Sequence, residues 1–453
     1  MNESLALSVE PKKYDLLLVS KTNNFDQRME YVANSFSYSF FKVASATEAE
    51  EKLIDTIVQF SVIDAGTSKD QNEVVGAIQV LRFLFPKTSI LVVFPKKIDK
   101  AALEWIRKSG ANFLMSEVDF LTLAKFDFMA NQMIGTDYLP VKHADFKVGS
   151  RIEIPLYYSM PANRKYVPII KEKTILDDSR IEKIRKIGEV YIRRIDVDRF
   201  NQYLQANQDQ SAKGLIRRCR VQFGEFRSAY LKLVNHLTED SEAATYEEGK
   251  KILEECQKLS EALITSMMSA GSVFDIISQS VAGEFNSVER APERAAIIGY
   301  LCVMGDIGNS QQAILATLLA DVGMLNLPYE TLNYFRLNGV NNLDEAKRLA
   351  YEGHPQVAIN CAAQKKIQLD PLVRDTILYS HARLDQTGYP IVRREKIGIE
   401  AQLLQLVQIL DDLCQIQWGK ARPIYTEVLK TLILDPDTMG FLSPVIIKAL
   451  RSI

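Results

Sequence analysis

The strongest constraint on the fold is an alternation within residues 13–135, where four continuous apolar runs are separated by segments of helical periodicity. The runs are YDLLLVS (14–20), FSVIDA (60–65), SILVVFP (89–95) and ANFLMSE (111–117). Strands that are apolar at nearly every position are typical of parallel sheets covered by helices on both faces. The pattern therefore predicts an open α/β sheet domain over residues 1–138.

The rest of the chain divides into three regions of different pattern. Residues 146–204 mix β-like runs with one helical segment, which predicts a small mixed α/β module, and TDYLPVKHADFKVGS (136–150) reads as the linker before it. From about residue 206 strand patterns nearly disappear. Residues 205–285 are predicted to be a helical connector, in which the Met267–Met268 pair serves packing, and residues 286–453 an all-helical domain.

Composition and charge exclude several functional classes. The 453 residues carry a formal net charge of -2, so no strong electrostatic field recruits nucleic acid or an anionic membrane. We find no run of about 18 apolar residues and no basic N-terminus followed by an apolar stretch, so neither a membrane span nor a secretory signal is expected. The five scattered cysteines contain no CxxC pair and are typical of reduced core thiols. We expect a cytoplasmic protein.

The first candidate site is Asp64, which follows an apolar run where open α/β sheets carry functional residues. The layout resembles a response-regulator receiver domain, which is flavodoxin-like, with Asp64 at the phosphoacceptor position. A receiver also has paired acids after the first strand, Ser or Thr after the fourth and Lys after the fifth. This chain has Ser20-Lys21-Thr22, Phe94 and Ser116 there. Because the groups that neutralise a transferring phosphoryl group are mostly missing, we predict a pseudo-receiver for docking or dimerisation, with phosphorylation of Asp64 as the alternative.

The second candidate site is spread over four stretches of the C-terminal region. They are LLADVGMLNLP (318–328), EGHPQVA (352–358), SHARLDQTGYP (380–390) and EAQLLQLVQILDDL (400–413). In order and spacing they resemble the HD-GYP family, all-helical phosphodiesterases that hydrolyse the bacterial second messenger cyclic di-GMP at a two- or three-metal centre. Such a centre clamps the attacking and leaving oxygens between adjacent metals, which requires many His and carboxylate ligands.

Carried over residue by residue, the family pattern shows a deficit of ligands. Three of eight expected ligand positions keep a metal-binding side chain: Asp321, His354 and His381. The other five carry residues that replace the family's ligands: Ser287, Ala291, Ala320, Ser380 and Gln408. The Lys that contacts a phosphate in the family is Met324, the Glu after the His pair is Ala382, and the Gly after Asp385 is Gln386.

The three surviving residues leave two interpretations open. Three donors plus water can hold one Zn²⁺ or Mn²⁺, so at most one weakly bound divalent metal is expected. Alternatively, no cofactor binds, and the three side chains hydrogen-bond to one another and to the backbone as a polar remnant. A single metal would lack the partner ion that the clamp needs, so we expect no catalytic residues.

The loop after His381 keeps its shape-determining residues, namely Arg383, Asp385, Gly388, Tyr389 and Pro390. Gly388 can take a positive φ, and Pro390 fixes the following turn. In the family this loop lies beside the active site, and in some members it contacts diguanylate cyclases or adaptor proteins. It is therefore predicted to bind such signalling partners, with the alternative that it only turns the chain and Tyr389 packs locally.

Together these patterns predict a bacterial signal-transduction protein. The small module resembles the domains that precede HD-GYP domains in other signalling proteins, and the order of regions is that of such a protein. We predict a pseudoenzyme that acts through protein partners and could sense cyclic di-GMP. The alternative is an active or weakly active metal-dependent cyclic di-GMP phosphodiesterase. A homodimer is also expected, because receiver-like domains and amphipathic connectors often bury apolar faces between subunits.

Overall fold

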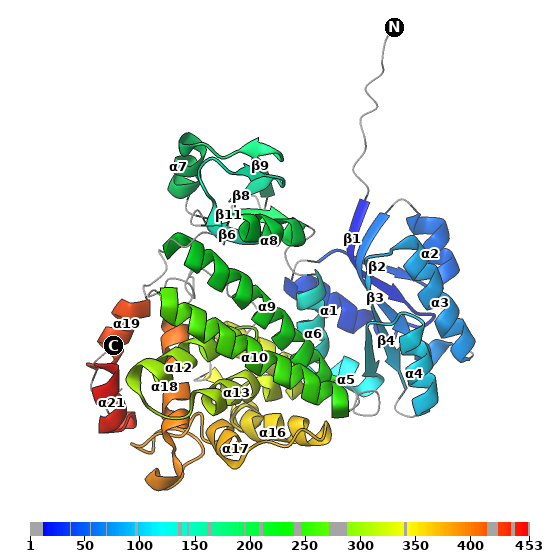
Figure 1. Cartoon of the computed structure of the whole chain (residues 1–453). Coiled ribbons are helices and arrows are strands. Elements are labelled where there is room, and N and C mark those ends of the chain that lie inside the picture. The colour runs from blue at the N-terminus through cyan, green and yellow to red at the C-terminus, as the bar shows by residue number, and fades with distance from the viewer. Residues whose placement is uncertain are drawn as a thin grey trace. The chain divides into compact units, whose positions relative to one another are not determined.

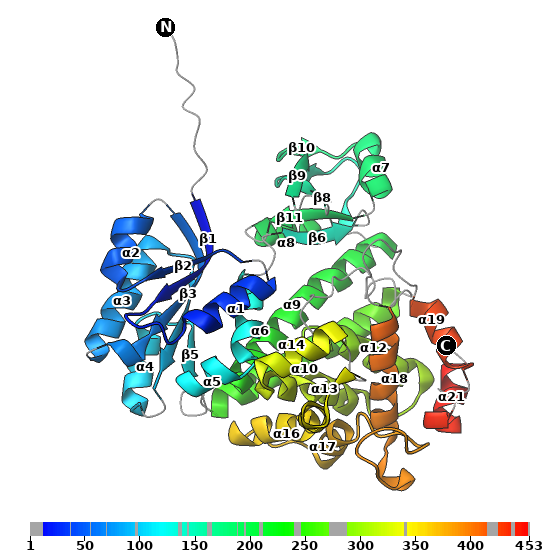
Figure 2. The same cartoon turned by 180° about the vertical axis from the view of Figure 1, so that it is seen from behind.

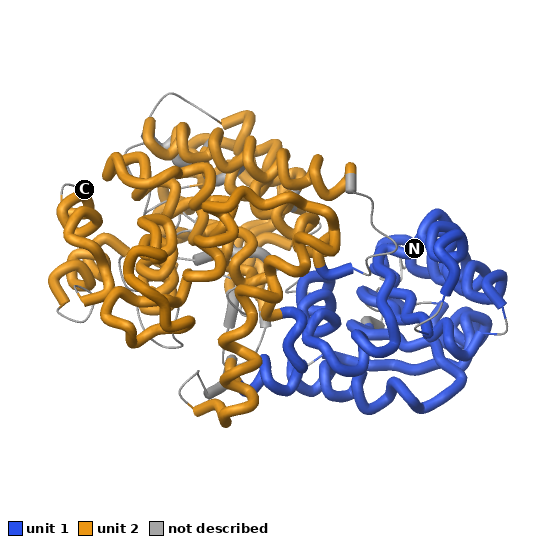
Figure 3. Tube along the Cα trace, turned by 90° about the horizontal axis from the view of Figure 1, so that it is seen from below, with its two compact units in different colours: residues 1–135, 238–245, 325–334 blue, residues 136–237, 246–324, 335–453 orange. Residues whose placement is uncertain are grey.

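A computed structural model describes most of the chain from residue 12 to residue 451. The residues left out within that range are 37, 55, 69, 96–97, 135–137, 143–144, 161–164, 188, 194–195, 208–211, 240–245, 271–287, 339–341, 415–424 and 436–439. The chain divides into two compact units, of which unit 1 comprises residues 1–135, 238–245 and 325–334 and unit 2 the remainder (Figure 3). Among the described helices none is sufficiently long and apolar to cross a bilayer.

Unit 1 is built on a parallel five-stranded sheet, as the apolar runs predict (Figure 1). Its elements are β1 (Lys12–Val19), α1 (Asp26–Phe36), β2 (Phe40–Val43), α2 (Ala46–Leu53), β3 (Thr56–Asp64), η1 (Ala65–Thr67), α3 (Gln71–Leu84), β4 (Ser89–Phe94), α4 (Lys100–Lys108), β5 (Phe113–Ser116), α5 (Glu117–Thr122) and α6 (Lys125–Ile134). The strand order β2-β1-β3-β4-β5 is the doubly wound order of flavodoxin-like sheets. An α/β domain is therefore confirmed, and its assignment as a receiver stays a prediction.

Helices cover both faces of this sheet, which explains why its strands are apolar throughout. Helices α2, α3 and α4 pack on one face and α1, α5 and α6 on the other, as the back view also shows (Figure 2). Alternate strand residues serve the two cores, with Leu17 facing one and Leu16 the other. The four predicted strands are β1, β3, β4 and β5. The fifth, β2, was not predicted, because FFKV is a short edge strand that contains a lysine.

Unit 1 also takes in residues 325–334, which follow Asp321 in the chain and precede His354 and His381. The backbone amide of Ala124 donates to the Leu327 carbonyl at 3.0 Å. The guanidinium of Arg28 lies 3.9 Å from the centre of the Tyr329 ring, which is a cation–π distance. Arg28 is itself buried and forms an ion pair with Asp127 of α6. Residues 325–334 are therefore held by α1, α5 and α6 through specific contacts.

Unit 2 begins with the predicted small mixed module. Its elements are β6 (Tyr138–Lys142), β7 (Arg151–Ile152), β8 (Leu156–Met160), β9 (Lys165–Ile170), β10 (Thr174–Ile175), α7 (Asp178–Ile187), β11 (Glu189–Arg193) and α8 (Val197–Ala206). Strand β11 pairs antiparallel with both β6 and β8, giving the order β6-β11-β8-β9. Strand β6 lies in the segment expected to be a linker, so the module's sheet begins before residue 146. Its cross-strand hydrogen bonds could not be foreseen from the local pattern.

The remainder of unit 2 is helical in its described parts, as predicted. Its elements are α9 (Ala212–Thr238), α10 (Tyr246–Ala270), α12 (Ala291–Gly305), α13 (Ser310–Ala320), η5 (Val322–Asn326), α14 (Tyr329–Asn338), α15 (Glu345–Glu352), α16 (His354–Gln364), α17 (Pro371–Leu378), η7 (Arg394–Lys396), α18 (Ile399–Leu413), α19 (Tyr425–Leu432) and α21 (Pro444–Leu450). Part of α9 and of α14 lies in unit 1. All five cysteines are buried free thiols, in agreement with their interpretation as core residues.

Helix α10 of the predicted connector packs directly on the helical domain. A Cβ added at Gly299 of α12 would lie 2.3 Å from the Ile264 side chain of α10, so the glycine permits the two helices to approach closely. Met267, one turn further on, is fully buried, which confirms its packing role. The connector is therefore part of the helical core over α10 rather than a free linker.

Candidate functional site

Asp321 occupies the turn between α13 and η5 and is the first surviving ligand-type residue. Helix α13 is apolar around its circumference and buried from Ala313 to Ala320, so the carboxylate that follows it is also buried. The next turn lies against the start of α16, where a Cβ on Gly323 would stand 2.0 Å from the His354 carbonyl oxygen. The glycine in the motif is therefore required for Asp321 and His354 to meet.

His354 is the first residue of α16 and has no exposed surface. Its Nδ1 lies 2.6 Å from the Tyr351 carbonyl oxygen. Since a carbonyl only accepts, Nδ1 carries the hydrogen and Nε2 is directed into the centre. The backbone therefore determines which ring nitrogen of His354 is available.

His381 lies in the loop after α17 and completes the group. The Tyr389 ring stacks on the His381 ring with the centroids 4.7 Å apart, and the Tyr389 amide donates to the His381 carbonyl at 2.9 Å. A Cβ on Gly388 would lie 2.1 Å from that carbonyl oxygen. The described loop folds back on itself at this point and holds the imidazole in place.

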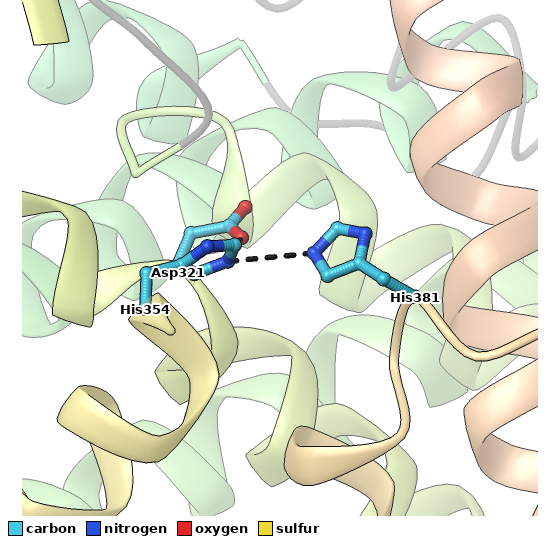
Figure 4. Close-up of side chains that lie close together, drawn as sticks. All are labelled: Asp321, His354 and His381. Carbon is cyan, nitrogen blue, oxygen red and sulfur yellow. Dashed lines mark hydrogen bonds and ion pairs between the residues drawn. The ribbon is translucent and has the colours of Figure 1, made fainter. Parts of the chain in front are cut away.

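The three side chains converge on one point (Figure 4). His354 Nε2 lies 3.4 Å from His381 Nε2 and 3.5 Å from Asp321 Oδ1. Burial, together with the neighbouring His354, lowers the pKa of His381 to about 3, so the His381 ring is neutral. Burial acts to raise the pKa of Asp321, but the neighbouring His354 and the charge of Arg294 outweigh it and hold that pKa below its ordinary value. A carboxylate and a neutral imidazole thus face His354.

Arg290 and Arg294, at the start of α12, form an ion-pair network beside this group. The sequence did not predict this network. Arg294 contacts Asp321 Oδ2 through Nη1 at 2.8 Å, Asp411 Oδ2 through Nε at 2.7 Å and Asp412 Oδ1 through Nη2 at 3.0 Å. Arg290 contacts Asp411 at 2.9 Å and Asp412 at 2.6 Å. The four-residue spacing of the arginines places them on one side of the helix, but Glu293 beside them and the apolar residues around them leave no polar face that marks the network in the sequence.

The positions that lack family ligands are buried around the same region. Ala291, Ala320, Ser380 and Gln408 all have little or no exposed surface, and Ser287 lies outside the described residues. Alanine has no donor atom, and a neutral amide is a weaker ligand than a carboxylate. Among the described residues, Asp321, His354 and His381 are the one group of three or more ligand-type side chains with atoms within 4.8 Å of one another.

The predicted partner-binding loop is ordered by its own side chains. Asp385 accepts from the Thr387 amide at 3.0 Å and from its hydroxyl at 2.7 Å, while Arg383 lies over the Phe441 ring at 4.5 Å. The Tyr389 hydroxyl is buried and Tyr389 packs edge-on to Tyr351. The aromatic ring therefore positions His381, and the tip of Tyr389 is not presented at the surface.

Two conformations in this loop differ from expectation. The structure does not give Gly388 the positive φ expected of it; the glycine is needed for close approach instead. The residue with a positive φ is Gln386, at 64°, where the family pattern has glycine. Exposed surface lies just beyond Pro390, with Ile391 74% exposed.

Asp64 is placed at the carboxyl end of β3, as predicted, but it is buried and hydrogen-bonded. The Ser20 hydroxyl donates to Oδ2 at 2.7 Å and the Gly66 amide to Oδ1 at 3.0 Å. At the other receiver positions, the Ser116 hydroxyl accepts from the Asp119 amide and caps α5, and Phe94 is buried in the core. These contacts give each group a structural role.

Comparison with known proteins supports an HD domain in this region. Residues 272–437 match the family model described as "HD domain". A solved structure titled "Bd1817, a HDG"Y"P protein from Bdellovibrio bacteriovorus" is 16% identical with a TM-score of 0.43, covering 70% of this chain and 98% of that chain. No curated protein matches. The helical region thus contains a segment, residues 272–437, that is similar to HD domains.

HD domains usually bind divalent metals, and the residues present fit at most one ion. One carboxylate and two imidazoles are a donor set that suits Zn²⁺ or Mn²⁺. Charge opposes occupancy, however, because Arg294 and Arg290 already balance the buried Asp321 and Asp411. The described residues supply no ligand set for a second ion near the first.

Proposed function

We propose that this chain is an HD-GYP-like signalling protein that does not hydrolyse cyclic di-GMP efficiently and acts through protein partners. The observation that carries the proposal is the ligand set at the centre. Three donors converge on one point, and the positions of four further family ligands hold Ala291, Ala320, Ser380 and Gln408. Phosphodiester hydrolysis at a two-metal centre requires ions on both sides of the scissile bond.

The test is a hydrolysis assay of the purified full chain with cyclic di-GMP and added Mn²⁺ or Fe²⁺. We expect no turnover above that of an Asp321→Asn variant, which removes the one carboxylate of the set. Turnover that depends on Asp321, together with two or more bound metal equivalents, would establish the alternative of a weakly active phosphodiesterase. Asp321→Asn also removes the ion pair with Arg294, so thermal unfolding must first show that this variant folds, and Asp411→Asn is not used because it breaks ion pairs with both Arg290 and Arg294.

A binding function without cleavage is tested separately. Calorimetry with cyclic di-GMP up to high micromolar concentration distinguishes a passive receptor, which gives heat, from a protein that acts only through partners, which gives none. Each outcome leaves the hydrolysis result unaffected, since binding and turnover are measured independently.

Partner binding would use the exposed residues beside the Gly-Tyr-Pro turn. Ile391 is an exposed apolar side chain, and Arg393 and Arg394 follow it on the surface. Tyr389 is packed against His381, so a Tyr389→Ala change would disturb the loop as well as the surface. Ile391→Asp changes the surface alone. Loss of binding to a purified diguanylate cyclase or adaptor in Ile391→Asp, with unchanged thermal stability, would support the loop as the binding element.

The N-terminal domain would supply the regulatory input as a pseudo-receiver. Residues 325–334 lie in unit 1 and continue directly from η5, which begins one residue after Asp321. A change in unit 1 could thus alter the centre and the loop by shifting the population of two states. Acetyl phosphate should not label the chain. Labelling that is lost in Asp64→Asn would show a functional receiver instead. The proposal also includes a homodimer, and light scattering would test it by measuring the molar mass of the protein in solution.

A further inference from the structure

We propose that Arg294 is the resident cation of the buried centre, so that its guanidinium supplies the positive charge that a metal ion supplies elsewhere and the centre assembles without metal. Arg294 lies within α12 and is almost fully buried. All three of its nitrogens contact carboxylates, at 2.7 to 3.0 Å. This inference deepens the metal-free part of the proposed function.

The carboxylates require a counter-charge wherever it comes from. Asp321 and Asp411 each have side chains with 3% exposed surface. An ionised carboxylate buried without a partner is strongly unfavourable. Arg294 contacts both, and Arg290 contacts Asp411 a second time, while Asp412 is 59% exposed and partly served by water. The two buried carboxylates, Asp321 and Asp411, are therefore balanced by the two buried arginines, Arg290 and Arg294, before any ion is added.

Guanidinium geometry suits this role better than a lysine would. It presents five donors in a rigid planar fork and stays charged at every physiological pH. Here the fork connects the Asp321 turn to the end of α18, which carries Asp411 and Asp412. Along the chain, Asp321 lies 27 residues and Asp411 lies 117 residues after Arg294. One side chain thus links the elements that bound metals would otherwise link.

The same contacts disfavour an ion on Asp321, His354 and His381. Arg294 donates a hydrogen bond to Oδ2 of Asp321, and its positive charge already compensates the negative charge of that carboxylate. A divalent ion at the remaining oxygen would add two positive charges beside a fixed guanidinium, with the two imidazole rings as the other donors. Removing the guanidinium charge should therefore convert the group into a metal site.

The experiment compares thermal unfolding of the full chain in EDTA and with one or two equivalents of Zn²⁺ or Mn²⁺. Wild type and Arg294→Lys, which keeps the charge, should change by less than about 1 °C between these conditions. Arg294→Gln should melt lower in EDTA and recover by about 5 °C or more with Zn²⁺. Adding His381→Ala to Arg294→Gln should abolish that recovery.

Two results would overturn the inference. The first is a wild-type protein that is destabilised by EDTA and restored by stoichiometric metal. The second is an Arg294→Gln variant that folds and does not respond to metal. If Arg294→Gln fails to fold, calorimetric titration of wild type with Zn²⁺ decides the matter, since one tightly bound equivalent contradicts the inference and no binding supports it. Hydrolysis of cyclic di-GMP is measured separately, so failure of the proposed function is recognised on its own.

Discussion

Replacing Glu293 by glutamine should stabilise the protein above neutral pH and leave it nearly unchanged near pH 5. Glu293 lies in α12 next to Arg294 and has 1% exposed surface. Among the described residues, its carboxylate oxygens have no hydrogen-bond partner apart from the residue's own backbone amide. Burial raises the pKa of Glu293 to about 7, with Asp411 adding to the rise and Arg227 and Arg290 opposing it.

The magnitude follows from linkage between protonation and folding. Below pH 4.5 both the folded and the unfolded chain bind the proton, so this carboxyl does not reduce stability. Between pH 4.5 and 7 the unfolded chain releases the proton while the folded chain keeps it, so stability falls as pH rises. At roughly 1.4 kcal/mol per pH unit, the loss reaches about 3 kcal/mol above pH 7. Glutamine mimics the protonated form and removes this loss.

Urea unfolding at pH 5 and pH 8 measures the effect. Glu293→Gln should exceed wild type by about 3 kcal/mol at pH 8 and by less than about 1 kcal/mol at pH 5. Glu254→Gln on the exposed side of α10 is the matched control and should change neither value appreciably. The reasoning is refuted if Glu293→Gln destabilises the protein at pH 8, or if its effect is the same at both pH values.

Three further predictions concern packing and backbone. Arg28→Met should reduce stability in urea by about 3–5 kcal/mol because it removes the buried cation that pairs with Asp127, whereas Lys52→Met on an exposed pair should lose less than about 0.5 kcal/mol; equal losses would contradict this. Gly323→Ala should lose about 3 kcal/mol or more, since its Cβ would meet a rigid carbonyl of α16, and a neutral effect would disprove the close approach. Gln386→Gly should gain about 0.5 kcal/mol by relieving a positive φ, and a lower melting temperature would argue against strain there.

The sheet domain was predictable because its signal is local. Strands buried on both faces are continuous apolar runs, so β1, β3, β4 and β5 can be read directly from the sequence. Strand β2 at the sheet edge and β6 of the small module lack that signal, since each acquires its role from the strand it pairs with. Propensity over four or five residues is too weak to specify such pairing.

The site was predictable only in part, and for a different reason. A family motif brings together Asp321, His354 and His381, which no local pattern could place within one centre. The same motif identifies only ligand positions, and it does not point to Arg294 because arginine is not a metal ligand. Helix α12 is buried on almost every side, so its periodicity shows no polar face that would mark the arginine as unusual.

Under the proposed function, the replacement of family ligands and the retention of Asp321 are compatible once the arginines are considered. If alanine and serine had replaced ligands with no other change, the remaining buried carboxylates would lack a counter-charge, and the domain would be destabilised by several kcal/mol per unpaired ion. Arg294 meets that need from within the chain, with a charge that does not depend on metal supply. Gly323, Gly388 and the Tyr389–His381 stack hold the loops around the centre, while ion pairs hold its interior. The shape available to a partner would then persist under conditions that strip metal from a hydrolytic relative.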